Sequence, residues 1–200
     1  MIEITGLKKA YDGRAIIDGL NFSASEGEVV GIFGGKGCGK SLLLKMIMGI
    51  VKPDEGRIAI DNRLISKNSY RDVAYVTDKR ALFYDMSTVE HMDYLRYYYP
   101  RFSEEIFKQY VQFFQLQINA KLEKLSPEDV EKVDIALAMA KSTKYLILDE
   151  PFKGMIPKDR IRYLQTMFSN LREDKIVLVA MRNSQGMKDL VDRALIIEKD

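Results

Sequence analysis

The eight residues at 34–41 have the types and the spacing needed to hold a phosphate group. They read Gly34-Gly35-Lys36-Gly37-Cys38-Gly39-Lys40-Ser41 and fit the phosphate-binding pattern G-x-x-x-x-G-K-[ST]. The glycines let successive backbone N–H groups, up to that of Leu42, turn toward one point, and a helix that begins there adds the positive end of its dipole. Lys40 would reach the β- and γ-phosphates of a nucleotide, and the Ser41 hydroxyl would bind Mg²⁺. A plain glycine turn is disfavoured because an apolar strand precedes the loop and a helical pattern follows it.

Two carboxylates, Asp149 and Glu150, follow an apolar run at 145–148, about a hundred residues after the glycine-rich loop. Ligands of α/β sheets bind at the carboxyl ends of strands, so this run would place both side chains at such an edge. Asp149 is then expected to hold Mg²⁺ through water, and Glu150 to accept a proton from an attacking water. An Asp-Glu-Pro sequence alone is more often a turn that ends a strand. Its combination with the upstream glycine-rich loop favours a magnesium-binding and catalytic role for these two carboxylates.

Strands that alternate with helices are expected to position these groups. Apolar runs predict strands at 29–33, 145–148 and 176–180, with a last strand in 190–198. Helical patterns at 41–48 and 157–171 lie between them. This order predicts an α/β fold with a largely parallel sheet.

Two further parts are expected around this parallel core. Alternating residues at 1–7, 15–23 and 57–61, with a short strand at 73–76, predict an antiparallel β subdomain made of 1–28 and 57–77. Helical patterns predict a helical subdomain over 84–140, in which Ser87 and Glu90 form a capping box and Ser126 is an N-cap.

A cluster of aromatic residues lies in the expected helical subdomain. It comprises Tyr94, Tyr97, Tyr98, Tyr99, Phe102, Phe107, Tyr110, Phe113 and Phe114. We expect the cluster to form the core of the subdomain, which is favoured over a base-stacking surface. His91, in the first of these helices, is expected to be a solvated polar position.

The composition excludes several classes of protein. The chain has 200 residues, 46% apolar and 30% charged, which fits one globular domain over 1–200. A net charge of +2, from 31 basic and 29 acidic residues, gives no case for nucleic acid as a partner. The single cysteine rules out an internal disulfide and fits a reducing cytosol. We expect no signal peptide, and no apolar run approaches the ~20 residues that span a bilayer, so any membrane contact needs a partner.

The order of these motifs resembles an ATP-binding-cassette (ABC) transporter ATPase, over nearly the whole chain. The resemblance rests on the glycine-rich loop, the helical insert, Leu125-Ser126 and the apolar strand with Asp-Glu-Pro. It implies a P-loop NTPase fold and a cytoplasmic subunit on the inner face of the cell membrane. That subunit would hydrolyse Mg-ATP, pair with a second ATPase as a homodimer or heterodimer, and drive a separate transmembrane permease. It also places Tyr11 where the family stacks an aromatic residue on adenine; the alternative is a half-buried hairpin tyrosine.

A narrower resemblance concerns the cargo. The segments at 83–91 and 99–102 are similar to a subclass that drives efflux of drugs and of antimicrobial or toxic peptides. By the same analogy, the loop at 78–86 is expected to dock the membrane partner.

Four segments depart from the family pattern. The signature Leu-Ser-Gly-Gly-Gln is replaced by Leu-Ser-Pro-Glu-Asp at 125–129. In the family, the Ser126 segment would contact the γ-phosphate bound to the partner subunit. Here that segment has lost one N–H donor and has gained two carboxylates. Asp78 occupies the position of the family's glutamine, and Arg182 occupies the position of its switch histidine. Arg182 can pair with a γ-phosphate but cannot carry a proton at neutral pH. The loop at 152–157 lacks the usual serine and aspartate.

These departures leave alternatives open. The chain is expected to be the ATPase of an exporter, with slow turnover, or an ATP-binding subunit of a heterodimer that hydrolyses poorly or not at all. A soluble cassette acting on DNA or ribosomes is disfavoured by the charge balance. Cys38 lies beside the expected phosphates, where a reactive thiol could block binding on oxidation. The favoured alternative is a small residue that fits the loop.

Overall fold

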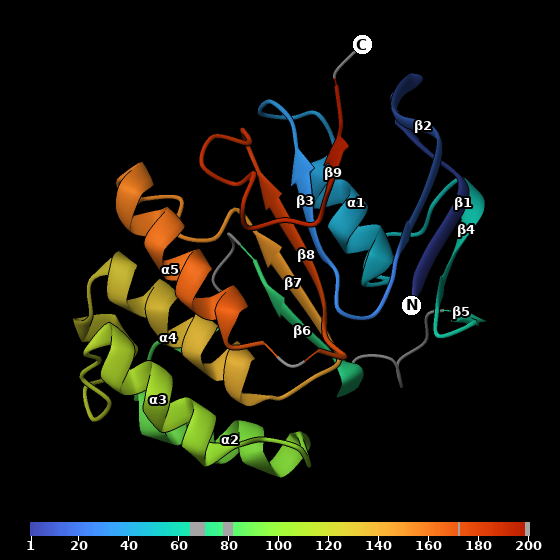
Figure 1. The fold of residues 1–200 in the computed structure, drawn as a ribbon. Coiled ribbons are helices and arrows are strands. Elements are labelled where there is room, and N and C mark those ends of the chain that lie inside the picture. The colour runs from blue at the N-terminus through green and yellow to red at the C-terminus, as the bar shows by residue number, and fades with distance from the viewer. Residues whose placement is uncertain (65–70, 78–81, 172, 199–200) are drawn as a thin grey trace.

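Two sheets, five α-helices and a short 3-10 helix at Leu122–Lys124 lie in the part of the chain that the structure describes (Figure 1). The computed structural model describes residues 1–64, 71–77, 82–171 and 173–198, so Asp78 lies outside it. The strands are β1 (Ile2–Tyr11), β2 (Arg14–Ala24), β3 (Val29–Phe33), β4 (Glu55–Ile60), β5 (Arg63–Leu64), β6 (Val73–Val76), β7 (Tyr145–Asp149), β8 (Ile176–Met181) and β9 (Arg193–Ile196). The helices are α1 (Lys40–Ile47), α2 (Thr88–Tyr98), α3 (Glu104–Phe114), α4 (Pro127–Ala140) and α5 (Pro157–Ser169). None of these helices is long and apolar enough to cross a membrane.

The larger sheet is parallel and has the strand order β6-β7-β8-β3-β9. Every residue of β7 and of β8 is buried, because helices cover both faces of the sheet. Continuous apolar runs are typical of strands in such a position. The largely parallel α/β core expected from the sequence is thus confirmed.

The smaller sheet is antiparallel, with the order β2-β1-β4-β5. Asp12 and Gly13 join its first two strands with φ angles of 50° and 75°, as a tight hairpin requires. One assignment differs from the prediction. Strand β6, expected in the antiparallel part, pairs with β7 in the parallel sheet. A four-residue apolar run fits either sheet, and only its long-range pairing decides between them.

Helix α1 lies between the two sheets (Figure 1). Leu43, Leu44 and Ile47 are fully buried there, against apolar side chains of both sheets. Because α1 starts directly after the loop that follows β3, this packing fixes the position of the loop as well.

Helices α4 and α5 cover the opposite face of the parallel sheet, and α2 and α3 lie outside them (Figure 1). Ser87 and Glu90 form the predicted capping box of α2. The aromatic cluster divides: Phe107, Tyr110 and Phe114 are buried as predicted, whereas Tyr94, Tyr97 and Tyr98 are exposed. The prediction for His91 was wrong. Its side chain is buried, accepts the Phe83 N–H at Nε2 (3.0 Å), and has Nδ1 2.8 Å from the Ser87 carbonyl.

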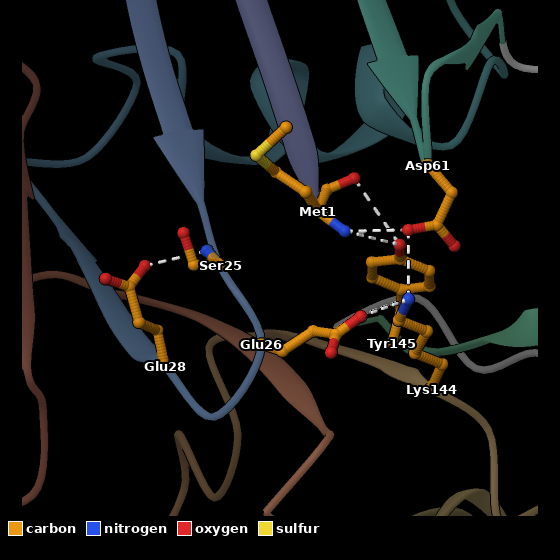
Figure 2. Close-up of polar contacts among 7 residues, drawn as sticks. All are labelled: Met1, Ser25, Glu26, Glu28, Asp61, Lys144 and Tyr145. Atoms are coloured by element: carbon orange, nitrogen blue, oxygen red, sulfur yellow. Dashed lines mark hydrogen bonds and ion pairs between the residues drawn. The ribbon is translucent and has the colours of Figure 1, made fainter.

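A polar network joins the antiparallel sheet to the start of β7 (Figure 2). The Asp61 carboxylate accepts from the Met1 amine (2.7 Å) and from Lys144 (2.9 Å), and Lys144 also pairs with Glu26 at 2.6 Å. Burial opposes the charge on Asp61. Even so, these hydrogen bonds and one from Tyr145 hold the pKa of Asp61 well below its usual range. The network lies at the amino end of β7, away from the edge where β7 carries Asp149.

Candidate active site

Three neighbouring strands bring the expected site residues to one edge of the parallel sheet. The loop at 34–39 follows β3, Asp149 ends β7, and Arg182 directly follows β8, which pairs with both of the other strands. Parallel strands end at the same edge, so residues more than a hundred positions apart become neighbours (Figure 1). This is the edge at which α/β sheets bind ligands.

The glycine-rich loop has the geometry of an anion site. Gly37 and Gly39 have φ angles of 80° and 106°, which favour glycine. Among the hydrogen bonds of the described residues, none uses the backbone N–H groups of Gly35, Lys36, Gly37 or Gly39. Four free donors beside the start of α1 fit the oxygens of a polyphosphate. The loop is tightly packed from behind, because a Cβ at Gly34 would lie 2.2 Å from the Ile197 carbonyl oxygen.

Lys40 lies folded against its own loop. Its amine donates to the carbonyl oxygens of Gly34 (2.7 Å) and Gly35 (3.0 Å), and Glu150 Oε1 is 3.6 Å away. The side chain is 5% exposed, so this cation is held at the base of the loop. It lines the same pocket as Lys36, Gly37 and Gly39.

Ser41 and Asp149 form the candidate magnesium site. The Ser41 hydroxyl donates to Asp149 Oδ1 at 3.0 Å. A hydroxyl and a carboxylate fit Mg²⁺, which usually takes one or two protein oxygens together with water and substrate phosphates. No group of three or more His, Cys, Asp or Glu side chains in the described ranges could hold a metal without other ligands. The donor set therefore fits a magnesium ion that arrives with a nucleotide.

Glu150, the candidate base, lies beside two cations. Its Oε1 atom is 3.6 Å from Lys40 Nζ and 3.9 Å from Arg182 Nε. The side chain is 9% exposed, and its other oxygen, Oε2, has no hydrogen-bond partner within the described residues. Arg182 is half exposed, and the two side chains line the same pocket.

A pocket of about 390 Å³ opens over these groups. It is lined by Tyr11, Ile16, Lys36, Gly37, Gly39, Lys40, Ser41, Leu42, Glu150, Lys153 and Arg182. Tyr11 is half exposed, and the Lys9 amine lies 5.3 Å from its ring centroid. Thus the pocket runs from a half-exposed aromatic ring to the candidate base.

Ser126 does not lie in this pocket. It lines a second cavity of about 690 Å³, which shares Glu150 and Lys153 with the first. Its hydroxyl donates to Asp129 Oδ2 (2.8 Å) and accepts the Asp129 N–H, while Lys132 pairs with Glu128 at 2.7 Å. The polar groups at the start of α4 are therefore engaged with one another.

Two further residues complete the description of the site. Cys38 is buried, and its sulfur lies 2.5 Å from where a Gly34 Cβ would be, which agrees with a small residue that fills the loop. Glu131, on α4, was not predicted from the sequence. Its carboxylate accepts the Phe152 N–H at 2.5 Å, directly after the Glu150-Pro151 pair. An acidic residue in the first turns of a helix gives no sequence signal for such a contact.

The chain is similar to known transport ATPases in sequence. A family model described as ABC transporter matches residues 17–153. LptB of Haemophilus influenzae, a lipopolysaccharide export system ATP-binding protein, is 27% identical, with 96% of this chain and 84% of LptB aligned. YtrB of Bacillus subtilis, an ABC transporter ATP-binding protein, is 27% identical, with 99% and 69% aligned.

Solved structures have the same fold. A putative ABC transporter ATP-binding protein from Pyrococcus furiosus superposes with a TM-score of 0.85 at 20% identity, over 98% of this chain and 96% of that one. A dimeric bacterial ABC transporter cassette, MJ0796, gives a TM-score of 0.82 at 23% identity, over 99% and 94%. At these sequence identities, the structural similarity shows a shared fold and nothing more specific.

Proposed function

This chain belongs to the ABC transporter family and is an ATP-hydrolysing, ATP-binding subunit, and from this premise we propose where and how it uses ATP. Residues 34–42 would hold Mg-ATP, and Glu150 would be the base for its hydrolysis. The observation that carries this proposal is the 3.0 Å hydrogen bond between Ser41 and Asp149, which lie 108 positions apart in the sequence. It joins the phosphate-binding loop to the strand that carries the base.

Each side chain of the site has a defined task in the proposed reaction. The free N–H groups of the loop and the Lys40 amine hold the phosphates and offset the negative charge that develops on them. The Glu150 carboxylate accepts the proton of the water that attacks the terminal phosphorus, while the bond to the leaving oxygen breaks. Arg182, which stays charged, pairs with the terminal phosphate oxygens and carries no proton. Tyr11 stacks on the adenine.

Magnesium would be held by the Ser41 hydroxyl and, through water, by Asp149. When bound, the ion supplies neutralisation of the charge shared by the β- and γ-phosphate oxygens. The Ser41–Asp149 contact supports this assignment because it places the hydroxyl and the carboxylate within 3.0 Å of each other.

We further propose that two such subunits close on ATP, as a homodimer or a heterodimer, at the cytoplasmic face of the membrane. They would drive export of a drug or peptide through a separate permease. LptB is the ATP-binding protein of a lipopolysaccharide export system, and MJ0796 is a dimeric transporter cassette; both support this arrangement. Phe83, in the described part of the loop proposed to dock the permease, is 51% exposed.

A second candidate is a subunit that binds ATP but hydrolyses it poorly. The start of α4 supports it, because Ser126 donates its proton to Asp129 and Lys132 neutralises Glu128 within the same turns. Because these donors are already used within α4, fewer of them are available to bind the phosphate of a nucleotide held by a partner subunit. The intact Glu150 opposes this candidate.

Phosphate release and calorimetric titration with Mg-ATP distinguish the two candidates. We expect Glu150→Gln to keep the heat of ATP binding and to lose most phosphate release, because only the proton acceptor is removed. Lys40→Ala should lose both, since it removes a phosphate ligand, and circular dichroism checks that it folds. Equal background release by the wild type and Glu150→Gln, alone and with the permease, would support the second candidate. No heat from the wild type would contradict both.

A further inference from the structure

The loop that carries the candidate base has an unusual backbone. Glu150 and Phe152 have φ angles of 53° and 56°, the left-handed region that residues with a Cβ seldom adopt. Pro151, between them, has no N–H to donate. Such residues cost about 1–3 kcal/mol each and persist only where the surroundings hold them. The position of the Glu150 carboxylate therefore depends on what fixes this loop.

Contacts from three directions hold the loop. The Glu150 N–H donates to the Ala180 carbonyl on β8 at 2.9 Å. The Phe152 ring is fully buried, with its centroid 5.9 Å from that of Phe114 and 5.2 Å from that of Tyr163. The third contact is polar and comes from α4, through Glu131.

Glu131 is the side chain that reaches from α4 to this loop. Its Oε1 accepts the Phe152 N–H at 2.5 Å. Burial raises the pKa of Glu131, although the Phe152 N–H and the neighbouring backbone and charge of Lys153 favour its charged form. A carboxylate kept partly out of water that accepts a backbone N–H is a specific acceptor for this loop.

We propose that Glu131 is a positioning residue for hydrolysis, which acts by fixing the loop from Glu150 to Lys153. The inference rests on the proposed role of Glu150 as the base. Glu131 lies one turn beyond Glu128 on α4, so it connects the start of that helix to the loop of the base through the hydrogen bond to the Phe152 N–H. The base then moves with α4 and not independently of it. A displacement of about 1 Å at a catalytic group can cost on the order of a hundredfold in rate.

The test compares Glu131→Leu with Glu131→Gln in the full chain. The leucine variant lacks both acceptors, and we expect its kcat for ATP to fall about tenfold or more, while the Kd for Mg-ATP from calorimetry stays within about twofold. The glutamine variant keeps one acceptor oxygen, and its kcat should recover to within about threefold of the wild type. Glu123→Leu, at an exposed position before the same helix, controls for the loss of one carboxylate.

Hydrogen exchange gives a readout that does not depend on turnover. The amide of Phe152 should exchange slowly in the wild type and faster in Glu131→Leu, by more than the amides of β8, which separates a local effect from a general loss of stability. Full kcat in Glu131→Leu, an equal loss of kcat and ATP affinity, or an unprotected Phe152 amide in the wild type would overturn the positioning role alone. A wild type that binds ATP without releasing phosphate would overturn the proposed hydrolysis, and the role of Glu131 with it.

Discussion

The ion pair between Lys40 and Glu150 makes a quantitative prediction about stability in the absence of nucleotide. The two side chains are 5% and 9% exposed, with Nζ and Oε1 separated by 3.6 Å. At an effective dielectric constant near 20, two unit charges at that distance attract by about 5 kcal/mol. Because removing Lys40 leaves the buried Glu150 charge with only the half-exposed Arg182 beside it, Lys40→Met should destabilise the fold by about 3 kcal/mol.

A double-mutant cycle isolates this interaction. Glu150→Gln should cost less than Lys40→Met, about 1 kcal/mol, because the Lys40 amine keeps its bonds to the Gly34 and Gly35 carbonyls. In the double variant the poorly compensated carboxylate is gone, so we expect a coupling energy of about 2 kcal/mol. The free energies of unfolding come from urea titrations of the wild type, both single variants and the double variant.

Arg182 provides the matched comparison. Its Nε lies 3.9 Å from the same Glu150 oxygen, but the side chain is 49% exposed. Solvent screens such a charge, so the cycle of Arg182→Met with Glu150→Gln should give a coupling of about 1 kcal/mol or less. Additive effects of Lys40→Met and Glu150→Gln, within about 0.5 kcal/mol, would refute the view that the buried Lys40 amine stabilises the negative charge of Glu150.

Two further predictions concern Asp134, which is partly buried on α4, and the packing behind the glycine-rich loop. Burial raises the pKa of Asp134 to about 6 from 3.8, so wild-type stability should fall as the pH rises through this window. Asp134→Asn should therefore gain about 1–3 kcal/mol at pH 7.5 and nothing below about pH 4 in urea titrations; the same gain at both pH values would contradict this. Gly34→Ala should lose both stability and the heat of ATP binding, since its Cβ would meet the Ile197 carbonyl at 2.2 Å. Gly35→Ala, with open space at its Cβ, should stay within about 1 kcal/mol in unfolding free energy, and equal stabilities would count against the clash.

Local patterns in the sequence predicted the parts of the fold that depend on near neighbours. The strand, loop and helix around residues 29–47 and the capping box of Ser87 and Glu90 follow from residue types a few positions apart. The order of motifs also predicted that the loop and Asp149 meet at one edge. These features need no knowledge of distant packing.

Features that depend on distant packing could not be predicted in the same way. The apolar run at Val73–Val76 has the same pattern in either sheet, and its register with β7 is a long-range property. His91 and Tyr97 lie on the same helix, yet the first is buried and the second exposed, because other segments cover only one side of α2. Glu131 shows the same limit, since its acceptor role depends on a loop 21 positions away.

Strand β8 has a consequence for how this protein can change during evolution. It is the single strand between β3 and β7, and ladder spacing sets the distance across it at about 10 Å. Insertions or deletions in the long stretch between β6 and β7 leave that spacing untouched, so the outer helices are free to diversify toward new binding partners. Within Ile176–Met181, by contrast, one added residue would turn Arg182 to the opposite side of the sheet. Tolerance to changes of length is thus distributed very unevenly along the chain.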